Sequence, residues 1–82
     1  MGSFFAYILK SEKDKKYYYG HASDLNKRLK NHNSGKVKST KSRRPMKIIY
    51  SEKFTCKSDA FKRELFFKSV NGYKWLKENG II

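Results

Sequence analysis

Three short segments of the chain are rich in aromatic and β-branched residues, and each has the length of a β-strand. Residues 4–10 read FFAYILK, and the two-residue repeat of a strand places the odd-numbered side chains on one face and the even-numbered ones on the other. The polar residues 11–16 predict a turn, after which residues 17–20 return as a second strand and complete a hairpin. Residues 46–54 predict a third strand.

The first helix is predicted directly after the hairpin. Ser23 or Asp24 can cap its N-terminus, because either side chain can accept a hydrogen bond from a free backbone N–H. The helix is expected to run to about His32, where an Asn-Ser-Gly sequence ends it. The following segment, up to residue 45, is polar, basic and rich in turn-forming residues. It predicts a loop.

Two further helices are predicted after the third strand. Thr55 or Ser58 starts one that continues to about Ser69, Asn71-Gly72 is expected to break it, and residues 73–79 form a short final helix. The element order β-β-α-β-α-α predicts an α+β fold with a small three-stranded antiparallel sheet flanked by three helices. The chain has 82 residues, and we expect residues 1–82 to form a single domain.

The charge of the chain points to an anionic partner. Lysine and arginine number 20 against seven aspartate and glutamate residues, a formal net charge of +13. Nucleic acid is favoured over an anionic membrane, because no predicted helix pairs a basic face with a broad lipid-seeking face. Solvation of a small domain by lysines explains only part of so large an excess.

Other sequence features narrow the class of protein. No apolar run is long enough to span a membrane, and the first residues lack the features of a signal peptide. Cys56 is the single cysteine, which excludes an internal disulfide and is typical of the reducing cytoplasm, where we expect the protein. No GxxxxGK[ST] loop, zinc-type Cys/His cluster or GxSxG sequence is present, which argues against an NTPase, a zinc finger and a serine hydrolase.

Glu64 is the first candidate for chemistry. Its neighbours one helical turn away are Ala60, Phe61 and Phe67, so its carboxylate is predicted on or beside a packed face. Burial of a carboxylate is costly unless a cation or hydrogen bonds compensate for it. A divalent ion such as Mg²⁺ can do so, because it accepts one carboxylate ligand and keeps most of its waters. An ordinary ion pair with a lysine is the alternative.

Four more residues are candidates. Arg28 lies on the predicted first helix, where its guanidinium is suited to a phosphate, although a lone arginine in a basic protein is more often a surface residue. Tyr7 and Tyr18 lie on adjacent strands, so their hydroxyls can converge near a reacting water, although most strand tyrosines serve packing. His32 is either a proton carrier or phosphate contact, or an ordinary residue at a helix end.

The loop after the first helix is the most cationic stretch of the chain. Its lysines, arginines and hydroxyls can neutralise and hydrogen-bond phosphates, unless it is simply a flexible solvated loop. With Lys27 on the preceding helix, the predicted nucleic-acid contacts are Lys36, Lys38, Thr40, Lys41, Arg43 and Arg44.

Taken together, the layout resembles the GIY-YIG nuclease superfamily, in particular its small single-domain bacterial branch. It also resembles the N-terminal nuclease domain of the bacterial excision-repair incision subunit, a DNA-repair enzyme. The resemblance covers nearly the whole chain. It rests on Tyr7, Tyr18-x-Gly20, Leu25-x-x-Arg28-Leu29-x-x-His32-Asn33-x-Gly35, Thr40, Pro45 and Ala60-x-x-x-Glu64.

This resemblance implies a fold, an activity and a set of roles. Tyr7 and Tyr18 would be the active-site tyrosines, Arg28 would bind the scissile phosphate, Glu64 would hold one divalent metal ion, Mg²⁺ or Mn²⁺, and His32 would assist. The reaction would be hydrolysis of a phosphodiester by activated water, with one of the tyrosines as the base or its assistant.

Three further residues, Gly20, Gly35 and Pro45, would have structural roles. The first motif departs from the family pattern, because it reads Phe5-Ala6-Tyr7 without a leading glycine. We also expect no appended DNA-binding domain, which is a further departure from the family pattern. Contacts are therefore expected to be mostly to phosphate, and a protein partner is the expected source of specificity.

The sequence therefore predicts a metal-dependent endonuclease acting on DNA rather than RNA. The alternative is a nucleic-acid-binding domain with the nuclease fold and little or no catalysis, acting through a partner. No heptad repeat or long apolar face argues for a particular oligomeric state.

Overall fold

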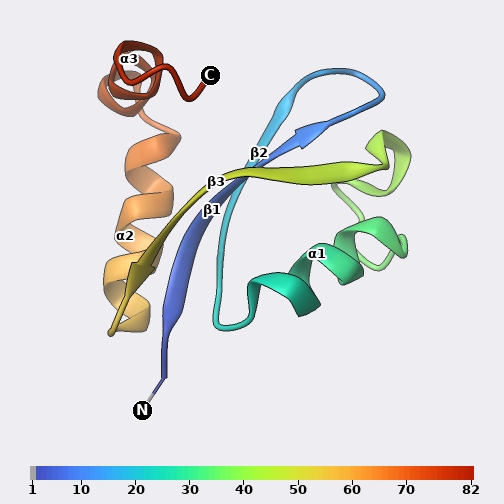
Figure 1. Cartoon of the computed structure of the whole chain (residues 1–82), viewed down its shortest axis with the longest axis horizontal. Coiled ribbons are helices and arrows are strands. Elements are labelled where there is room, and N and C mark those ends of the chain that lie inside the picture. Colours follow the sequence, from blue (N-terminus) through green and yellow to red (C-terminus); the bar gives the residue numbers. More distant parts are fainter. Residues whose placement is uncertain (1) are drawn as a thin grey trace.

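A three-stranded antiparallel sheet with strand order β2-β1-β3 forms the centre of the computed structural model, which describes residues 2–82. The element order β-β-α-β-α-α and the α+β architecture agree with the sequence prediction. The elements, shown in Figure 1, are β1 Phe4–Ser11, β2 Tyr17–Ala22, α1 Leu25–Asn33, a 3₁₀ turn Lys41–Arg43, β3 Met46–Phe54, α2 Lys57–Phe67 and α3 Val70–Glu78.

The helices cover opposite faces of the sheet, and the alternation of β1 determines which side chains face each layer (Figure 1). Even-numbered residues of β1 pack toward α2 and α3, in a cluster formed by Ala6, Ile8, Phe67 and Leu76. Odd-numbered residues pack toward α1, in a cluster formed by Tyr7, Leu9 and Met46. The division of β1 into two faces was therefore predicted correctly, and the sheet is buried on both sides.

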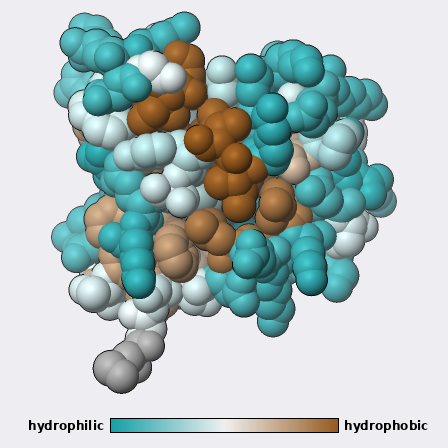
Figure 2. All heavy atoms as spheres, in the orientation of Figure 1, coloured by the Kyte–Doolittle hydropathy of each residue, from teal (hydrophilic) through white to brown (hydrophobic). Residues whose placement is uncertain are grey.

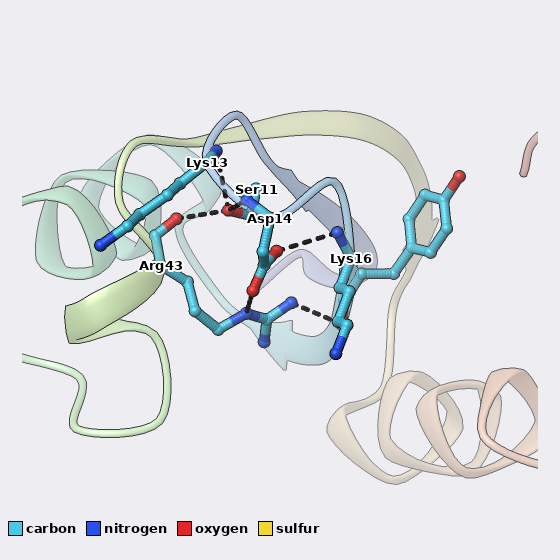
Figure 3. A network of polar contacts seen from close by, with 6 residues as sticks. Ser11, Lys13, Asp14, Lys16 and Arg43 are labelled. Atoms are coloured by element: carbon cyan, nitrogen blue, oxygen red, sulfur yellow. Dashed lines mark hydrogen bonds and ion pairs between the residues drawn. The ribbon is translucent and has the colours of Figure 1, made fainter.

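A network of side chains fixes the β1–β2 turn (Figure 3). Ser11 Oγ accepts hydrogen bonds from the backbone N–H groups of Lys13 and Asp14, at 3.1 and 3.0 Å. Asp14 Oδ1 accepts from the Lys16 N–H at 2.9 Å, while its Oδ2 accepts from Arg43 Nε at 2.9 Å. Ser11 Oγ also donates to the Arg43 carbonyl at 2.6 Å. The turn is thereby tied to the segment that leads into β3.

Helix α1 begins where a capping residue was expected. The side chain of Asp24 accepts from the Lys27 N–H at 3.0 Å, so Asp24 rather than Ser23 is the cap. The helix ends at Asn33, and Gly35 follows with φ +85°, a left-handed conformation that glycine adopts without strain. The Asn33 side chain then bonds both the N–H and the carbonyl of Met46, at 2.7 and 2.9 Å, which anchors the end of α1 to the start of β3.

The prediction for the junction between α2 and α3 was wrong. Helix α2 ends at Phe67, and Asn71-Gly72 lies in the first turn of α3 rather than between the helices. Ser69 caps α3 by accepting from the Gly72 N–H at 3.0 Å. A Cβ at Gly72 would lie 1.8 Å from the Phe66 carbonyl oxygen, so this glycine permits close approach of two helices instead of breaking one.

The start of α2 also differs slightly from the prediction. The helix begins at Lys57, with Cys56 at the N-cap position and no side-chain capping bond, so neither Thr55 nor Ser58 is the cap. Within residues 2–82, no helix has the length and apolar character needed to cross a membrane.

Candidate active site

A chain of hydrogen bonds runs from helix α1 into the sheet. Arg28 Nε donates to the hydroxyl oxygen of Tyr7 at 3.3 Å, and the same hydroxyl lies 3.1 Å from His32 Nε2. His32 Nδ1 lies 2.7 Å from Thr40 Oγ1, which donates to the Val37 carbonyl at 3.4 Å. The side chains of Tyr7, His32 and Thr40 are buried, with at most 1% of each residue exposed. Four side chains from three segments of the chain, β1, α1 and the loop after α1, are therefore linked by hydrogen bonds.

The positions of the protons in this chain follow from its two ends. Because Thr40 Oγ1 gives its proton to a carbonyl, it accepts from His32 Nδ1–H. His32 Nε2 is then unprotonated and accepts from the hydroxyl of Tyr7, whose oxygen in turn accepts from Arg28 Nε–H. Every donor has one acceptor, and the phenolic proton of Tyr7 points at a free imidazole nitrogen.

Electrostatics keep this chain neutral between Arg28 and Thr40. Burial, and secondly the charge of Arg28, lower the pKa of His32 to about 4, so its imidazole is uncharged at pH 7. Burial raises the pKa of Tyr7, and the hydrogen bond from Arg28 offsets only part of this effect. The phenol therefore keeps its proton at neutral pH unless the proton is passed on to another group.

Gly20 makes the position of Tyr7 possible. It is the residue directly opposite Tyr7 in the β1–β2 pairing. A Cβ at Gly20 would lie 2.5 Å from the Tyr7 hydroxyl oxygen and 2.6 Å from Cζ, closer than side-chain atoms come. The phenol thus passes over β2 where a side chain is missing, and it reaches Arg28 and His32, which lie one turn apart on α1.

The second motif tyrosine lies beside this chain. The ring of Tyr18 is 6.5 Å from that of Tyr7 and 4.8 Å from the imidazole of His32, centroid to centroid, in a tilted and an edge-on contact. Tyr18 and Tyr7 belong to the same layer, between the sheet and α1. The structure thus brings together four of the five residues predicted to be catalytic.

Glu64, the fifth, projects from α2 and reaches the end of β2. The residue is 8% exposed. Its Oε1 accepts from His21 Nδ1 at 2.7 Å, and its Oε2 accepts from Lys68 Nζ at 2.6 Å. Burial raises the pKa of Glu64, but the hydrogen bonds from Lys68 and His21 outweigh burial and hold the pKa below its ordinary value. The carboxylate is therefore ionised at neutral pH.

A groove joins the two sets of residues. It has a volume of about 310 Å³ and is lined by Phe4, His21, Ala22, Ser23, Arg28 and Lys57. Arg28 comes from the chain of hydrogen bonds and His21 from the pair with Glu64, so both sets border the same hollow at the end of β2. A second, shallower groove of about 220 Å³ continues along α1 past Lys27 and Asn31.

The residues that line the groove include no carboxylate, so a divalent cation near it would depend on Glu64, the hydrogen-bond partner of the lining residue His21. Among residues 2–82, no group of three or more His, Cys, Asp or Glu side chains is placed to hold a metal ion, so a site built from protein ligands alone does not occur there. Mg²⁺ needs fewer protein ligands, because it binds through one or two carboxylates, substrate phosphate oxygens and water. Glu64 can supply the carboxylate for such an ion.

His21 was not predicted as a site residue. Its position directly after Gly20 of the second motif is a weak signal for a site residue, but the predicted strand ended at residue 20. Because β2 continues to Ala22, alternation directs His21 toward α2, where its ring also contacts Phe61 edge-on at 5.2 Å. Only the packing of α2 against β2 reveals the pair with Glu64.

The predicted basic loop divides into exposed and structural residues. Lys36, Lys38, Lys41 and Lys27 are exposed, in agreement with a role at the surface. Thr40 is fully buried and bonded to His32, so the prediction that it contacts nucleic acid was wrong.

The two arginines of this loop are engaged in the fold itself. Arg43 pairs with Asp14 and donates to the Tyr17 carbonyl at 3.2 Å, which leaves little of its guanidinium for a ligand. Arg44 is exposed but donates to the Lys41 carbonyl at 2.8 Å, and Pro45 follows it after a cis peptide bond.

Hydrophilic side chains cover most of the visible surface around a hydrophobic band over the middle of the sheet (Figure 2).

Comparison with known proteins identifies the family to which this arrangement belongs. A family model described as the GIY-YIG catalytic domain matches residues 3–78. The chain belongs to the GIY-YIG family. The predicted family is therefore confirmed. GIY-YIG domains are nuclease domains that act on nucleic acid and generally use a divalent metal ion, so membership of the family supports nuclease activity in general.

Similar GIY-YIG proteins occur in bacteria. The chain is 44% identical over 71 residues to UPF0213 protein YazA of Bacillus subtilis, a match covering 85% of this chain and 71% of YazA. It is 44% identical over 78 residues to UPF0213 protein SSP2268 of Staphylococcus saprophyticus, covering 94% of each. The solution NMR structure of UPF0213 protein BH0048 from Bacillus halodurans has a TM-score of 0.54 and 30% identity, over 93% of this chain and 83% of that one.

Proposed function

We propose that this GIY-YIG protein is a metal-dependent endonuclease that hydrolyses phosphodiester bonds in DNA. The observation that carries the proposal is the hydrogen-bonded chain Arg28–Tyr7–His32–Thr40. Its Arg28 lines a groove that is also lined by His21, the hydrogen-bond partner of Glu64. A phenol that is hydrogen-bonded to both a guanidinium and a neutral imidazole can pass its proton to the imidazole while the guanidinium binds an anion.

The groove supports binding of a phosphate beside Arg28. Its guanidinium is partly exposed, donates only Nε to Tyr7, and so keeps N–H groups for a phosphate oxygen. Lys27 and Lys57 line the same hollows and can neutralise the neighbouring phosphates of a strand. Contacts to phosphates carry no sequence information, so binding by this surface is expected to depend mainly on the backbone of the nucleic acid.

Tyr7 is the proposed base for the attacking water. As the water oxygen bonds to phosphorus, the phenolic oxygen takes the water proton and the Tyr7 proton moves to His32 Nε2. The bond from phosphorus to one deoxyribose oxygen breaks, that oxygen takes a proton from solvent, and His32 afterwards releases its proton to solvent. Arg28 lowers the pKa of His32 in the free protein, so a phosphate that neutralises Arg28 makes His32 a better proton acceptor.

The remaining residues orient and complete the site. Tyr18 packs against both Tyr7 and His32 and limits their movement. Thr40 holds the His32 tautomer in which Nε2 is free. A divalent ion, Mg²⁺ or Mn²⁺, bound at Glu64 would offset the negative charge that develops on the phosphate during hydrolysis.

Substitution of Tyr7 tests this assignment. Tyr7→Phe removes the hydroxyl and keeps the ring, so single-turnover cleavage of labelled DNA should slow by about 10²- to 10⁴-fold while DNA binding is retained. Tyr17→Phe is the matched control, because Tyr17 lies on the face of the sheet opposite to Tyr7 and Tyr18. This variant should cleave at the wild-type rate. Cleavage by Tyr7→Phe at the wild-type rate would refute Tyr7 as the base.

A binding domain without catalysis is the second candidate, and one observation favours it. Both oxygens of Glu64 are engaged by cationic or hydrogen-bonding groups of the protein itself, which opposes metal binding. This alternative predicts binding that survives Glu64→Gln and no cleavage under any metal condition. If about five phosphates are neutralised, the slope of log K against log salt on duplex DNA should be about −4 to −5 in either case. A flat salt response would contradict both candidates.

A further inference from the structure

The ammonium group of Lys68 is bound to one oxygen of the Glu64 carboxylate. Lys68 Nζ lies 2.6 Å from Oε2, and His21 Nδ1 lies 2.7 Å from Oε1, so both oxygens of the carboxylate already have a partner. A divalent ion can bind Glu64 directly only if one of these partners withdraws.

The two partners differ in how easily they can move. The imidazole of His21 is held on β2, is 26% exposed at its side chain and packs edge-on against Phe61 at 5.2 Å. The side chain of Lys68 is 49% exposed, lies at the C-cap of α2 and ends a flexible four-carbon stem. Lys68 is therefore the partner that yields, at little cost to packing.

We propose that Lys68 is an internal competitor of the divalent ion at Glu64 and so sets the affinity of the site for metal. This inference rests on the proposed function, since it assumes that Glu64 is the metal ligand. In the metal-free protein the ammonium neutralises a nearly buried carboxylate, and it swings away when the ion binds.

One consequence concerns the order of binding. The free protein carries a formal charge of +13, and the carboxylate proposed to bind the ion is itself paired with a lysine. It should bind Mg²⁺ weakly on its own. A nucleic-acid phosphate next to Arg28 adds negative charge and further oxygen ligands, so metal and nucleic acid should each increase the affinity for the other.

The test measures metal binding directly rather than through cleavage. ¹⁵N-labelled wild-type protein, Lys68→Met, Lys62→Met and Glu64→Gln are titrated with MgCl₂ at constant ionic strength, and the amide shifts of α2 are followed by NMR. Lys62→Met removes the same charge from an exposed position two residues from Glu64, and therefore on another side of the helix. Both lysine variants carry the same net charge, so only the local contact differs.

Lys68→Met should bind Mg²⁺ about three- to tenfold more tightly than the wild type, because a positive charge next to the ion is removed in partly screened surroundings. Lys62→Met should resemble the wild type, and Glu64→Gln should lose the saturable response. Equal affinities of Lys68→Met and Lys62→Met would overturn the inference, as would a response that is unchanged in Glu64→Gln.

The experiments distinguish failure of the proposal for Lys68 from failure of the proposed nuclease function. Metal-dependent DNA cleavage by the wild type, together with an unchanged Mg²⁺ affinity in Lys68→Met, would refute the role of Lys68 and leave the nuclease assignment in place. Tighter Mg²⁺ binding by Lys68→Met in a protein that never cleaves DNA would support the role of Lys68 and count against the nuclease.

Discussion

The buried histidine of the hydrogen-bonded chain should make the stability of the protein depend on pH. His32 is fully buried and neutral, and its pKa is lowered from 6.5 to about 4. In the unfolded chain the same imidazole takes up a proton as the pH falls below its ordinary pKa, which stabilises the unfolded state relative to the native one. Stability should therefore fall as the pH decreases from about 6.5 to about 4, and should not change further through His32 below that window.

The expected size of this effect follows from the pKa difference. A change in the pKa of His32 from 6.5 in the unfolded chain to about 4 in the native one corresponds to about 3 kcal/mol in the free energy of unfolding, since one pKa unit is worth about 1.4 kcal/mol. Near pH 5 the slope should be about 1.2 kcal/mol per pH unit. This is a large share of the roughly 5–12 kcal/mol that a domain of this size possesses.

The assay is urea unfolding followed by circular dichroism between pH 7 and pH 5. Carboxylates such as Glu64 and Asp14 have lowered pKa values, so their contributions are lost only at more acidic pH and do not disturb this range. His32→Gln should abolish most of the slope even if the variant is less stable at pH 7. His21→Gln, which removes the other histidine, should retain the slope that His32 causes.

A free energy of unfolding that is constant between pH 7 and pH 5 would refute the reasoning. So would the same slope in the wild type and in His32→Gln. Either result would mean that the imidazole is not held neutral between Tyr7 and Thr40, and the proposed proton acceptor of the site would lose its physical basis.

Three further predictions concern residues around the site and the helix junction. Gly20→Ala places a Cβ 2.5 Å from the Tyr7 hydroxyl, where ordinary contact begins at 3.4 Å. The displaced phenol should lower the free energy of unfolding in urea by about 1–3 kcal/mol and slow DNA cleavage at least about 100-fold. Cleavage at the wild-type rate would contradict this prediction. Gly72→Ala places a Cβ 1.8 Å from a backbone oxygen and should lower the free energy of unfolding by roughly 3 kcal/mol or more. Gly80→Ala, in open space at φ +69°, should lower it by about 1 kcal/mol, with both variants measured by thermal unfolding. Equal losses of stability would contradict the close approach of α2 and α3. Thr40→Val keeps the shape but removes the acceptor for the histidine, so it should cost about 1–3 kcal/mol and reduce cleavage; a fully active, equally stable variant would count against the assigned tautomer.

Much of the fold could be predicted from the sequence because local patterns determine it. The alternation in residues 4–10 gives both faces of β1, and the third strand has the predicted bounds, Met46–Phe54. Asp24 identifies the start of α1 by its capping chemistry. Gly72 was misread because a glycine that ends a helix and a glycine that lets two helices touch look the same in a sequence.

The site could be predicted only in part, for a similar reason. Residues with distinctive chemistry at family positions, such as Tyr7 and Glu64, are visible in the sequence. The burial of Thr40 and the contact between His21 and Glu64 depend on how distant segments pack, so they carry no local signal. The sequence does not distinguish Lys68 from the other lysines, and only the structure shows that its ammonium group contacts the Glu64 carboxylate.

The most direct test of the account is single-turnover cleavage of end-labelled single-stranded, duplex and branched DNA by the wild type and by Glu64→Gln. Each reaction is run at low salt with Mg²⁺, with Mn²⁺ and with EDTA, and DNA binding is measured in parallel. The account predicts internal cleavage of at least one substrate that requires the metal and is lost in Glu64→Gln, while binding persists. Cleavage that continues in EDTA or in Glu64→Gln, or binding without cleavage under every condition, would contradict it.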